Sequence, residues 1–308
     1  MAAVVPVLRR IGVGPSGPAR IVALGCGGAG CHVLRRLRPG ENLVPVALND
    51  ALHPAMAGIP RRVLLDREPL RALAEADPAV AKETAAPVDS VIAGAIEGSH
   101  IAAIFAGLGG DTGGWASAVA ARVARDHGVP TIALVATPFA SEGLLRRRLA
   151  EEQGAALCRA ADAVVAFAND ALLRIAPKLP LARAFGALGA IMVRPAEELA
   201  RVARVDDIAP LREVFRSAGV WRYGAGEGRD RHAAFLAVEE AVASPWFERP
   251  PEEAIAGVAV LTLAPGASSD ETVRELRKRV PRASLLVGVA EDPVLAGRIQ
   301  VSLLAGWP

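Results

Sequence analysis

The chain has 308 residues, and its 35 Lys and Arg against 33 Asp and Glu give a formal net charge of +2. This length allows two domains with a substantial core, and the interspersed charges exclude a basic nucleic-acid-binding tail. Hydrophobic residues make up 52% of the chain, but no run of about 18 is free of charged or turn residues, so no direct membrane insertion is expected.

The N-terminal stretch MAAVVPVLRR places its apolar residues before its arginines, which is the reverse of a secretory signal. We therefore expect a cytoplasmic protein. From residue 20 onward, buried strand-like runs alternate with helix-like segments. The predicted strands are 20–25, 43–49, 99–110, 129–139 and 163–170, and the predicted helices are 29–38, 70–86, 116–128 and 144–161. This alternation predicts an α/β fold with a Rossmann-like parallel sheet and helices on both of its faces.

The pattern changes after about residue 190. PAEELARVARV, 195–205, predicts a helix that leads out of the first domain, and a second block begins at about 206. That block contains predicted helices at 231–243 and 271–280 and predicted strands at 255–266, 283–292 and 298–307. It indicates a smaller α+β domain with a mixed sheet.

The first glycine-rich turn, GCGGAGC at 25–31, follows a predicted buried strand. Gly25, Gly27 and Gly30 fit the dinucleotide pattern G-x-G-x-x-G, and Asp50 lies where a ribose-binding acid would stand in an NAD(P)- or FAD-binding Rossmann enzyme. The five histidines are scattered, however, and form no hydride-transfer constellation. The cysteines Cys26, Cys31 and Cys158 have no zinc or disulfide spacing, so no metal site is predicted.

The second glycine-rich turn, AGLGGDTGG at 106–114, also lies between a predicted strand and a predicted helix. Two such turns at helix N-termini can hold more phosphate charge than one pyrophosphate carries. They suit a nucleoside triphosphate at the carboxyl edge of the sheet. Neither turn has the lysine of G-x-x-x-x-G-K-[ST], so a P-loop NTPase is disfavoured.

With both turns in place, the chain from about 20 to 306 resembles the tubulin and FtsZ superfamily of polymerising GTPases, nearer to FtsZ. GCGGAGC resembles the first FtsZ loop, and AGLGGDTGG resembles the signature G-G-G-T-G-[ST]-G. Further along, TPFASEGLLRRR (137–148), FANDALL (167–173) and ARAFGAL (182–188) resemble family segments in the same order. The stretch VRELRKRV and the strands around it resemble the second domain.

The resemblance implies a role for each matching residue. Glu142 would face the ribose, Arg146 would lie near the phosphates, Asn169 would hydrogen-bond guanine and Phe185 would stack near it. His32 stands where the family has Asn. The implied phosphate-binding residues are Gly27, Gly28, Gly30, Gly109, Gly110, Thr112 and Gly113. Simpler interpretations remain open: a tight turn for the glycines, a core side chain for Phe185, and a helix ion pair for Glu142 and Arg146.

Several departures from the family pattern fall at this implied site. Asp111 replaces a glycine and would repel phosphates at about 4 Å by roughly 1 to 4 kcal/mol per charge pair, unless a cation neutralises it. Its Cβ would also restrict the backbone. Trp115 replaces another glycine, and its bulk is expected near the phosphates. Ala190 stands in place of the acid that pairs with guanine.

Two further departures concern hydrolysis. The loop that senses the γ-phosphate corresponds to LAEADPA, 73–79, which lacks glycines and prefers a helix. The hydrolytic loop N-x-D-x-x-D corresponds to ARVDDIAPL, 203–211, in which only Asp207 (or Asp206 in the neighbouring register) remains. The pair could equally cap the helix that follows. Losing one positioning acid should slow phosphoryl transfer.

Together these features imply an N-terminal extension (1–19), a nucleotide-binding-type domain (20–194), a central helix and hydrolytic-loop region (195–217) and a C-terminal α+β domain (218–308). We expect a cytoskeletal protein that self-assembles head to tail, with a degenerate GTP site and weak or absent hydrolysis. The alternatives are an active FtsZ-type GTPase in cell division or membrane remodelling, and the Rossmann enzyme above. The site would bind either GTP or GDP, or it would bind no nucleotide. Mg²⁺ is expected only together with GTP. Expected partners are further copies of the chain, another FtsZ or a membrane-associated protein contacting the folded body, since the chain ends at LLAGWP without the usual tail.

Overall fold

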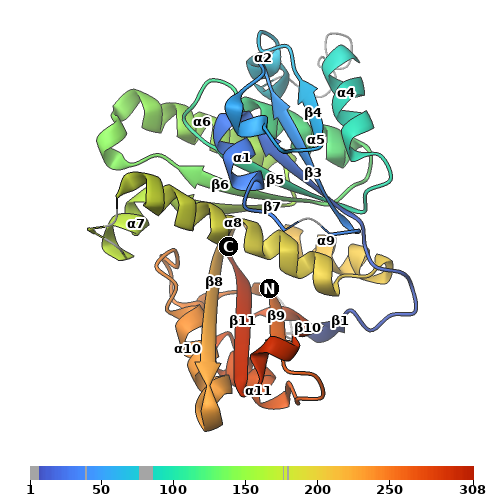
Figure 1. The fold of residues 1–308 in the computed structure, drawn as a ribbon, viewed down its shortest axis with the longest axis vertical. Coiled ribbons are helices and arrows are strands. Elements are labelled where there is room, and N and C mark those ends of the chain that lie inside the picture. Colours follow the sequence, from blue (N-terminus) through green and yellow to red (C-terminus); the bar gives the residue numbers. More distant parts are fainter. Residues whose placement is uncertain (1–6, 39, 76–85, 176, 179) are drawn as a thin grey trace. The chain divides into compact units, whose positions relative to one another are not determined.

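The computed structural model describes residues 7–38, 40–75, 86–175, 177–178 and 180–308 (Figure 1). They form two compact units. The first unit is Arg20–Glu197, and the second unit is Glu198–Pro308 together with the N-terminal segment up to Ala19. Each unit contains a set of hydrogen-bonded strands covered by helices, and the predicted α/β class is confirmed.

The sheet of the first unit is parallel throughout, with the strand order β7-β6-β5-β2-β3-β4. Its inner strands are almost fully buried because helices cover both faces of a parallel sheet. The strands are β2 (Ile21–Cys26), β3 (Leu43–Asn49), β4 (Arg61–Leu64), β5 (Ile101–Gly107), β6 (Thr131–Thr137) and β7 (Ala163–Ala168).

Helices α2 (Leu70–Glu75), α4 (Ala86–Ile96), α5 (Gly113–Asp126) and α6 (Leu144–Ala160) cover one face of this sheet. Helix α5 is buried on nearly every side, which its run of small residues permits. Its one buried cation, Arg122, forms a two-pronged ion pair with Asp89 of α4 at 2.6 and 3.0 Å. Helix α1 (Gly27–Leu34) packs on the sheet through Gly30, where a Cβ would clash with the carbonyl of Phe105.

Helix α8 (Leu181–Val202) is longer than the predicted helix at 195–205 and carries Pro195 in its interior. It begins in the first unit and ends in the second. A short helix, α7 (Asn169–Ile175), precedes it. No helix in the described ranges is both long enough and apolar enough to cross a membrane.

The second unit has a mixed sheet in the order β1-β10-β9-β11-β8, as predicted for this block, with β11 antiparallel to both neighbours and β1 at its edge. Helices α10 (Ala233–Val242) and α11 (Asp270–Arg279) share its main core cluster, and α9 (Ile208–Arg216) also packs on the sheet. The strands are β1 (Leu8–Ile11), β8 (Val220–Arg229), β9 (Ala256–Leu263), β10 (Ser284–Glu291) and β11 (Arg298–Trp307).

Candidate functional site

A cavity of about 1080 Å³ opens at the carboxyl ends of the first unit's strands, where α/β sheets usually bind ligands. Both glycine-rich turns border it, and so do α1, α6, α7 and α8. Ten of the predicted nucleotide-binding residues line the cavity: Gly27, Gly28, His32, Gly110, Thr112, Gly113, Glu142, Arg146, Asn169 and Phe185. The predicted Gly30 and Gly109 do not.

The two glycine-rich turns touch each other. Gly27 has a φ of +69°, and a Cβ on it would lie 2.7 Å from the Cα of Gly113. The N-termini of α1 and α5 therefore begin side by side at one end of the cavity. This end offers unpaired backbone N–H groups and the positive ends of two helix dipoles, the arrangement that binds phosphate.

The second turn is held in shape by a buried side chain that the sequence analysis missed. Gln153 of α6 accepts a hydrogen bond from the Gly109 N–H at 2.8 Å and donates to the Gly110 carbonyl at 2.7 Å. Because its N–H is already used, Gly109 shapes the turn and does not offer a donor to the cavity. Gly30 likewise serves packing.

Asp111 has a cationic partner within the chain. Its carboxylate lies 2.8 Å from the guanidinium of Arg67, which also approaches Asp50 at 3.8 Å. Asp50 accepts the Thr112 hydroxyl at 3.0 Å. Arg67 thus offsets part of the predicted repulsion. Asp111 has no strained φ, since Asp230 is the one described non-glycine residue with a positive φ.

Trp115, whose bulk the sequence placed near the phosphates, does not line the cavity. Its side chain is 4% exposed and belongs to the core cluster of the first unit, with Arg71 stacked on its ring at 5.4 Å, and it borders a second, smaller hollow beside Arg67 and Asp111. The position tolerates an indole because the helix turns it away from the cavity.

Two histidines meet on the cavity wall. The rings of His32 and His53 pack edge to face, with centroids 5.9 Å apart. The pKa of His32 is lowered by partial burial and by the neighbouring His53 and Arg35. The His53 Nδ1 accepts the Ala55 N–H, and its ring also faces Gly28. His32 is therefore a neutral donor or acceptor at neutral pH.

Glu142 and Arg146 form the i,i+4 ion pair that the sequence left as an alternative, at 3.1 Å. The other Glu142 oxygen accepts the Phe139 N–H at 2.7 Å. Both side chains still line the cavity. Glu142 is therefore a fixed carboxylate and Arg146 a half-exposed cation at this wall.

The two thiols near the cavity, those of Cys26 and Cys31, are in their unreactive protonated form. Cys26 lines the cavity but is fully buried, and burial raises its pKa far above the ordinary value. Burial also raises the pKa of Cys31 to about 12, and its thiol donates to the Gly25 carbonyl. Since the thiolate is the reactive form, both cysteines act as small packing residues.

The opposite end of the cavity combines an aromatic face with an unsatisfied amide. Phe185 of α8 is 43% exposed and packs edge to face on Phe139 with centroids 5.7 Å apart, so it is not a core side chain. Asn169, at the start of α7, is 6% exposed, and its Oδ1 is buried without a hydrogen-bond partner. A buried polar atom of this kind costs free energy unless a ligand or water satisfies it.

Helix α8 presents no acid to the cavity. Its lining residues are Ala182, Phe185, Gly186, Leu188, Gly189 and Met192. Ala190, predicted to stand in place of the guanine-binding acid, is exposed and does not line the cavity. Gly189, four residues after Phe185, occupies the cavity face instead, and the side chain of Arg36 passes over it.

Asp207, the predicted catalytic residue, lies in the second unit and is 3% exposed. Its Oδ2 accepts the N–H groups of Gly12 and Arg204, both at 2.9 Å. This placement makes Asp207 a structural anchor for the N-terminal segment and does not support a catalytic role. Asp206 is exposed and accepts the Ser16 N–H. Of the predicted γ-phosphate loop, residues 76–79 lie outside the described residues.

Sequence reasoning missed Arg36, His53, Arg67 and Gln153 as parts of this site and assigned Asp50 only to a ribose. Asp50 carried a usable signal, since it follows a buried strand directly. The others lie outside any glycine motif. No group of three or more possible metal ligands gathers among the residues that the structure covers.

Comparison with known proteins gives a consistent result. The family model described as "Tubulin/FtsZ family, GTPase domain" matches residues 20–177. Two curated relatives are named "Cell division protein FtsZ 1". The one from Pyrococcus horikoshii is 30% identical, covering 93% of this chain and 80% of its own length, and the one from Archaeoglobus fulgidus is 31% identical, covering 92% and 81%.

Solved structures share the fold. The structure titled "FtsZ dimer, empty" from M. jannaschii matches with a TM-score of 0.80 and 28% identity, covering 94% of this chain and 88% of that one. The GTPgS-bound protofilament of CetZ2 from Haloferax volcanii matches with a TM-score of 0.74 and 22% identity, covering 94% and 93%. The second likeness concerns the fold alone.

Proposed function

The chain belongs to the tubulin/FtsZ family of cytoskeletal GTPases, as its motifs predicted, and we propose that it binds a guanine nucleotide in the cavity of its first unit, assembles head to tail with itself and hydrolyses GTP slowly or not at all. The observation that carries the proposal is the juxtaposition of the two glycine-rich turns, with the buried, unpartnered Asn169 Oδ1 in the same cavity.

The residues at each end suit the two ends of a nucleotide. The N-termini of α1 and α5 would hold phosphates through their backbone N–H groups, while the Thr112 hydroxyl is already donated to Asp50. Phe185 would stack on the base and Asn169 would accept from it. Mg²⁺, if bound with GTP, would be held mainly by phosphate oxygens, because no described cluster of three ligands supplies a preformed cage.

Slow hydrolysis is supported by what the second unit lacks. Phosphoryl transfer depends on groups that position the attacking water and stabilise charge. The segment implied to do this carries Asp207 in a buried, backbone-bonded state and has Ala209 and Pro210 where a second acid would stand. Assembly would therefore not be coupled to rapid turnover.

Head-to-tail assembly is supported by family membership and by the solved relatives titled as a dimer and a protofilament. A heterologous contact that does not close produces filaments. The alternative, an active GTPase in cell division, is favoured by the names of the curated relatives. It predicts phosphate release that rises steeply with protein concentration.

The test begins with the purified chain. It is denatured, released nucleotide is identified by chromatography, and the native protein is pelleted with and without GTP while phosphate is measured. We expect guanine nucleotide, pelleting, and phosphate release near the background. Asn169→Ala should lose the nucleotide, whereas the control Arg183→Ala, an exposed α8 residue that does not line the cavity, should keep it. Absence of nucleotide binding by any preparation would refute the binding proposal, and rapid phosphate release would select the active GTPase.

A further inference from the structure

Residues of α1 and of the turn that follows it line the cavity. Gly28, Ala29, His32, Val33 and Arg36 all line it, at intervals of one and three or four residues. Arg36 lies eight positions after Gly28 and two positions after the end of α1 at Leu34, so the helical rise puts the two residues on the order of 12 Å apart along the chain axis. Gly28 belongs to the turn at the phosphate-binding end, so Arg36 lies near the other end.

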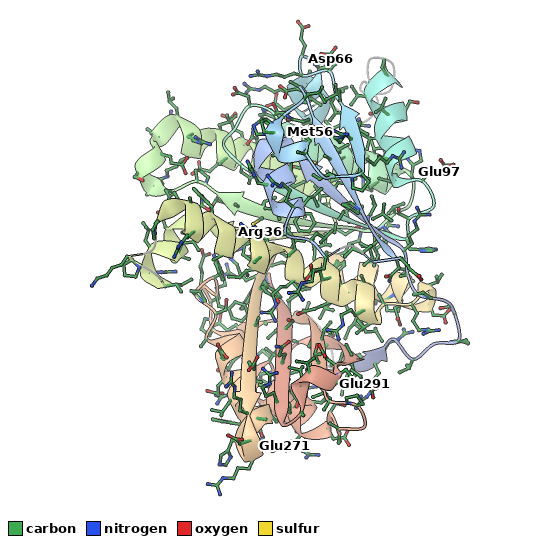
Figure 2. All side chains as sticks on the ribbon, in the orientation of Figure 1. Arg36, Met56, Asp66, Glu97, Glu271 and Glu291 are labelled. Atoms are coloured by element: carbon green, nitrogen blue, oxygen red, sulfur yellow. The ribbon has the colours of Figure 1, made fainter. Side chains whose placement is uncertain are left out.

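Arg36 is placed against the base-binding end by its contact with α8 (Figure 2). A Cβ on Gly186, the residue next to Phe185, would lie 3.0 Å from the Arg36 Nη2, and a Cβ on Gly189 would lie 3.5 Å from its Cγ. The two glycines thus make room for the arginine. The guanidinium is exposed and has no hydrogen bond or ion pair with the described residues, although it borders the cavity.

Two of the polar groups that line the cavity, Arg36 and Asn169, lack a partner within the described part of the chain at the guanidinium and at Oδ1, and are therefore free to bind a base. A guanidinium only donates, and the buried Asn169 Oδ1 only accepts. The α8 residues on the cavity wall are apolar or glycine. A base that fits must therefore present acceptors to Arg36 and an N–H to Asn169, next to a ring face for Phe185.

Resting on the proposed nucleotide site, we infer that this chain selects 6-oxopurine nucleotides through Arg36, which donates to O6 and N7 of the base, and that it does not require the 2-amino group of guanine. In protein–DNA complexes, arginine bonded to O6 and N7 in this bidentate way is the commonest specific contact to guanine. Hypoxanthine offers the same O6, N7 and N1–H. Adenine turns an amino donor toward the guanidinium and has no N1–H for Asn169, so ATP is excluded.

The experiment is direct calorimetric titration of GTP, ITP and ATP into the full chain and into Arg36→Met, which keeps the apolar stem. The matched control is Arg183→Met, which removes a cation from α8 without altering the cavity wall. Wild type should bind GTP and ITP within about threefold of each other and ATP at least about 30-fold more weakly, the effect of charge-assisted hydrogen bonds. Arg36→Met should weaken GTP and ITP together by about tenfold or more and leave ATP unchanged, so the GTP-to-ATP ratio collapses.

A third variant, Arg36→Met/Gly189→Asp, converts the donor wall into an acceptor wall. It should prefer GTP over ITP by about tenfold, because a carboxylate reads the 2-amino group. Two results would overturn the inference while leaving the proposed function intact. One is that the wild-type chain binds ITP more than tenfold more weakly than GTP. The other is that the ratio of the GTP and ATP affinities is the same in Arg36→Met as in wild type. If no nucleotide binds at all, the proposed function itself fails, and the inference fails with it.

Discussion

Arg67 sets the charge of the phosphate-binding end, and its removal gives a sharp test. It is flanked by Asp111 at 2.8 Å and Asp50 at 3.8 Å, so the three side chains sum to a charge of −1. Arg67→Met would make the summed charge of these side chains −2. A phosphate charge about 6 Å from the lost guanidinium interacts with it by roughly 0.7 kcal/mol at a dielectric constant of 80 and 3 kcal/mol at 20.

Because Arg67 is 56% exposed, the weaker half of that range applies, and we expect Arg67→Met to bind GDP about tenfold more weakly. Asp111→Asn should tighten binding slightly. The double variant, whose summed charge returns to −1, should fall within about threefold of wild type.

Calorimetric titration in low and high salt measures these affinities, and the differences should shrink at high ionic strength. Arg71→Met is the matched control, since Arg71 pairs with Glu75 and Glu152 outside the main cavity. Unchanged binding by Arg67→Met, or a double variant no better than Arg67→Met alone, would refute the electrostatic reasoning.

Two other consequences can be measured. Asp207→Ala should lower the free energy of unfolding by about 2 to 4 kcal/mol in urea titrations, because the N–H groups of Gly12 and Arg204 lose their buried acceptor. Asp206→Ala, at an exposed position, should lower it by less than about 1 kcal/mol. A larger loss for Asp206→Ala than for Asp207→Ala would contradict the structural role of Asp207. The pKa of His32 lies below its ordinary 6.5 in the free protein, and a nearby polyanion favours the charged form, so GDP binding should take up protons and strengthen as pH falls from 7 toward 5.5. Titrations in buffers of different ionisation enthalpy should show this uptake, and it should be smaller in His32→Asn; equal uptake by both proteins would exclude His32 as the group.

The glycine-rich turns were predictable because their chemistry is local. Each follows a buried strand and precedes a helix, so residues a few positions apart determine the turn. Arg36, Arg67 and Gln153 come from separate segments and carry no motif. Only the packing of α1 on α8, of the loop after β4 on the second turn, and of α6 beneath that turn brings them to the cavity.

The guanine-binding position on α8 illustrates how a small sequence error becomes a large spatial one. One residue along a helix rotates a side chain by about 100°. Ala190 was assigned to the cavity and is exposed outside it, while Gly189 lines it. The sequence correctly predicted that this part of α8 has no acid. It could not predict that Arg36 packs over Gly189, because that contact depends on the fold.

Strands β8 and β1 were missed for physical reasons too. β8 reads as a glycine-rich loop, yet a Cβ at Gly224, Gly226 or Gly228 would clash with backbone carbonyls of α10. The glycines therefore permit close packing of helix on strand and do not mark a turn. β1 has two exposed arginines in four residues, as an edge strand tolerates, and its partner β10 lies far along the chain.

The side chains near the glycine-rich turns do not supply the positive charge that would attract the phosphates of a nucleotide. Near the turns, Asp50, Asp111 and Arg67 sum to −1, and Glu142 cancels Arg146, while Arg35 and Arg36 gather along the wall toward the base-binding end. Phosphate binding must therefore depend on backbone N–H groups and helix N-termini, whose partial charges act at short range. Such a site favours a nucleotide whose own charge is partly neutralised by a cation. It follows that a diphosphate, or a triphosphate carrying Mg²⁺, should bind better than the free triphosphate, and that the identity of the base should contribute an unusually large share of the selectivity through Arg36.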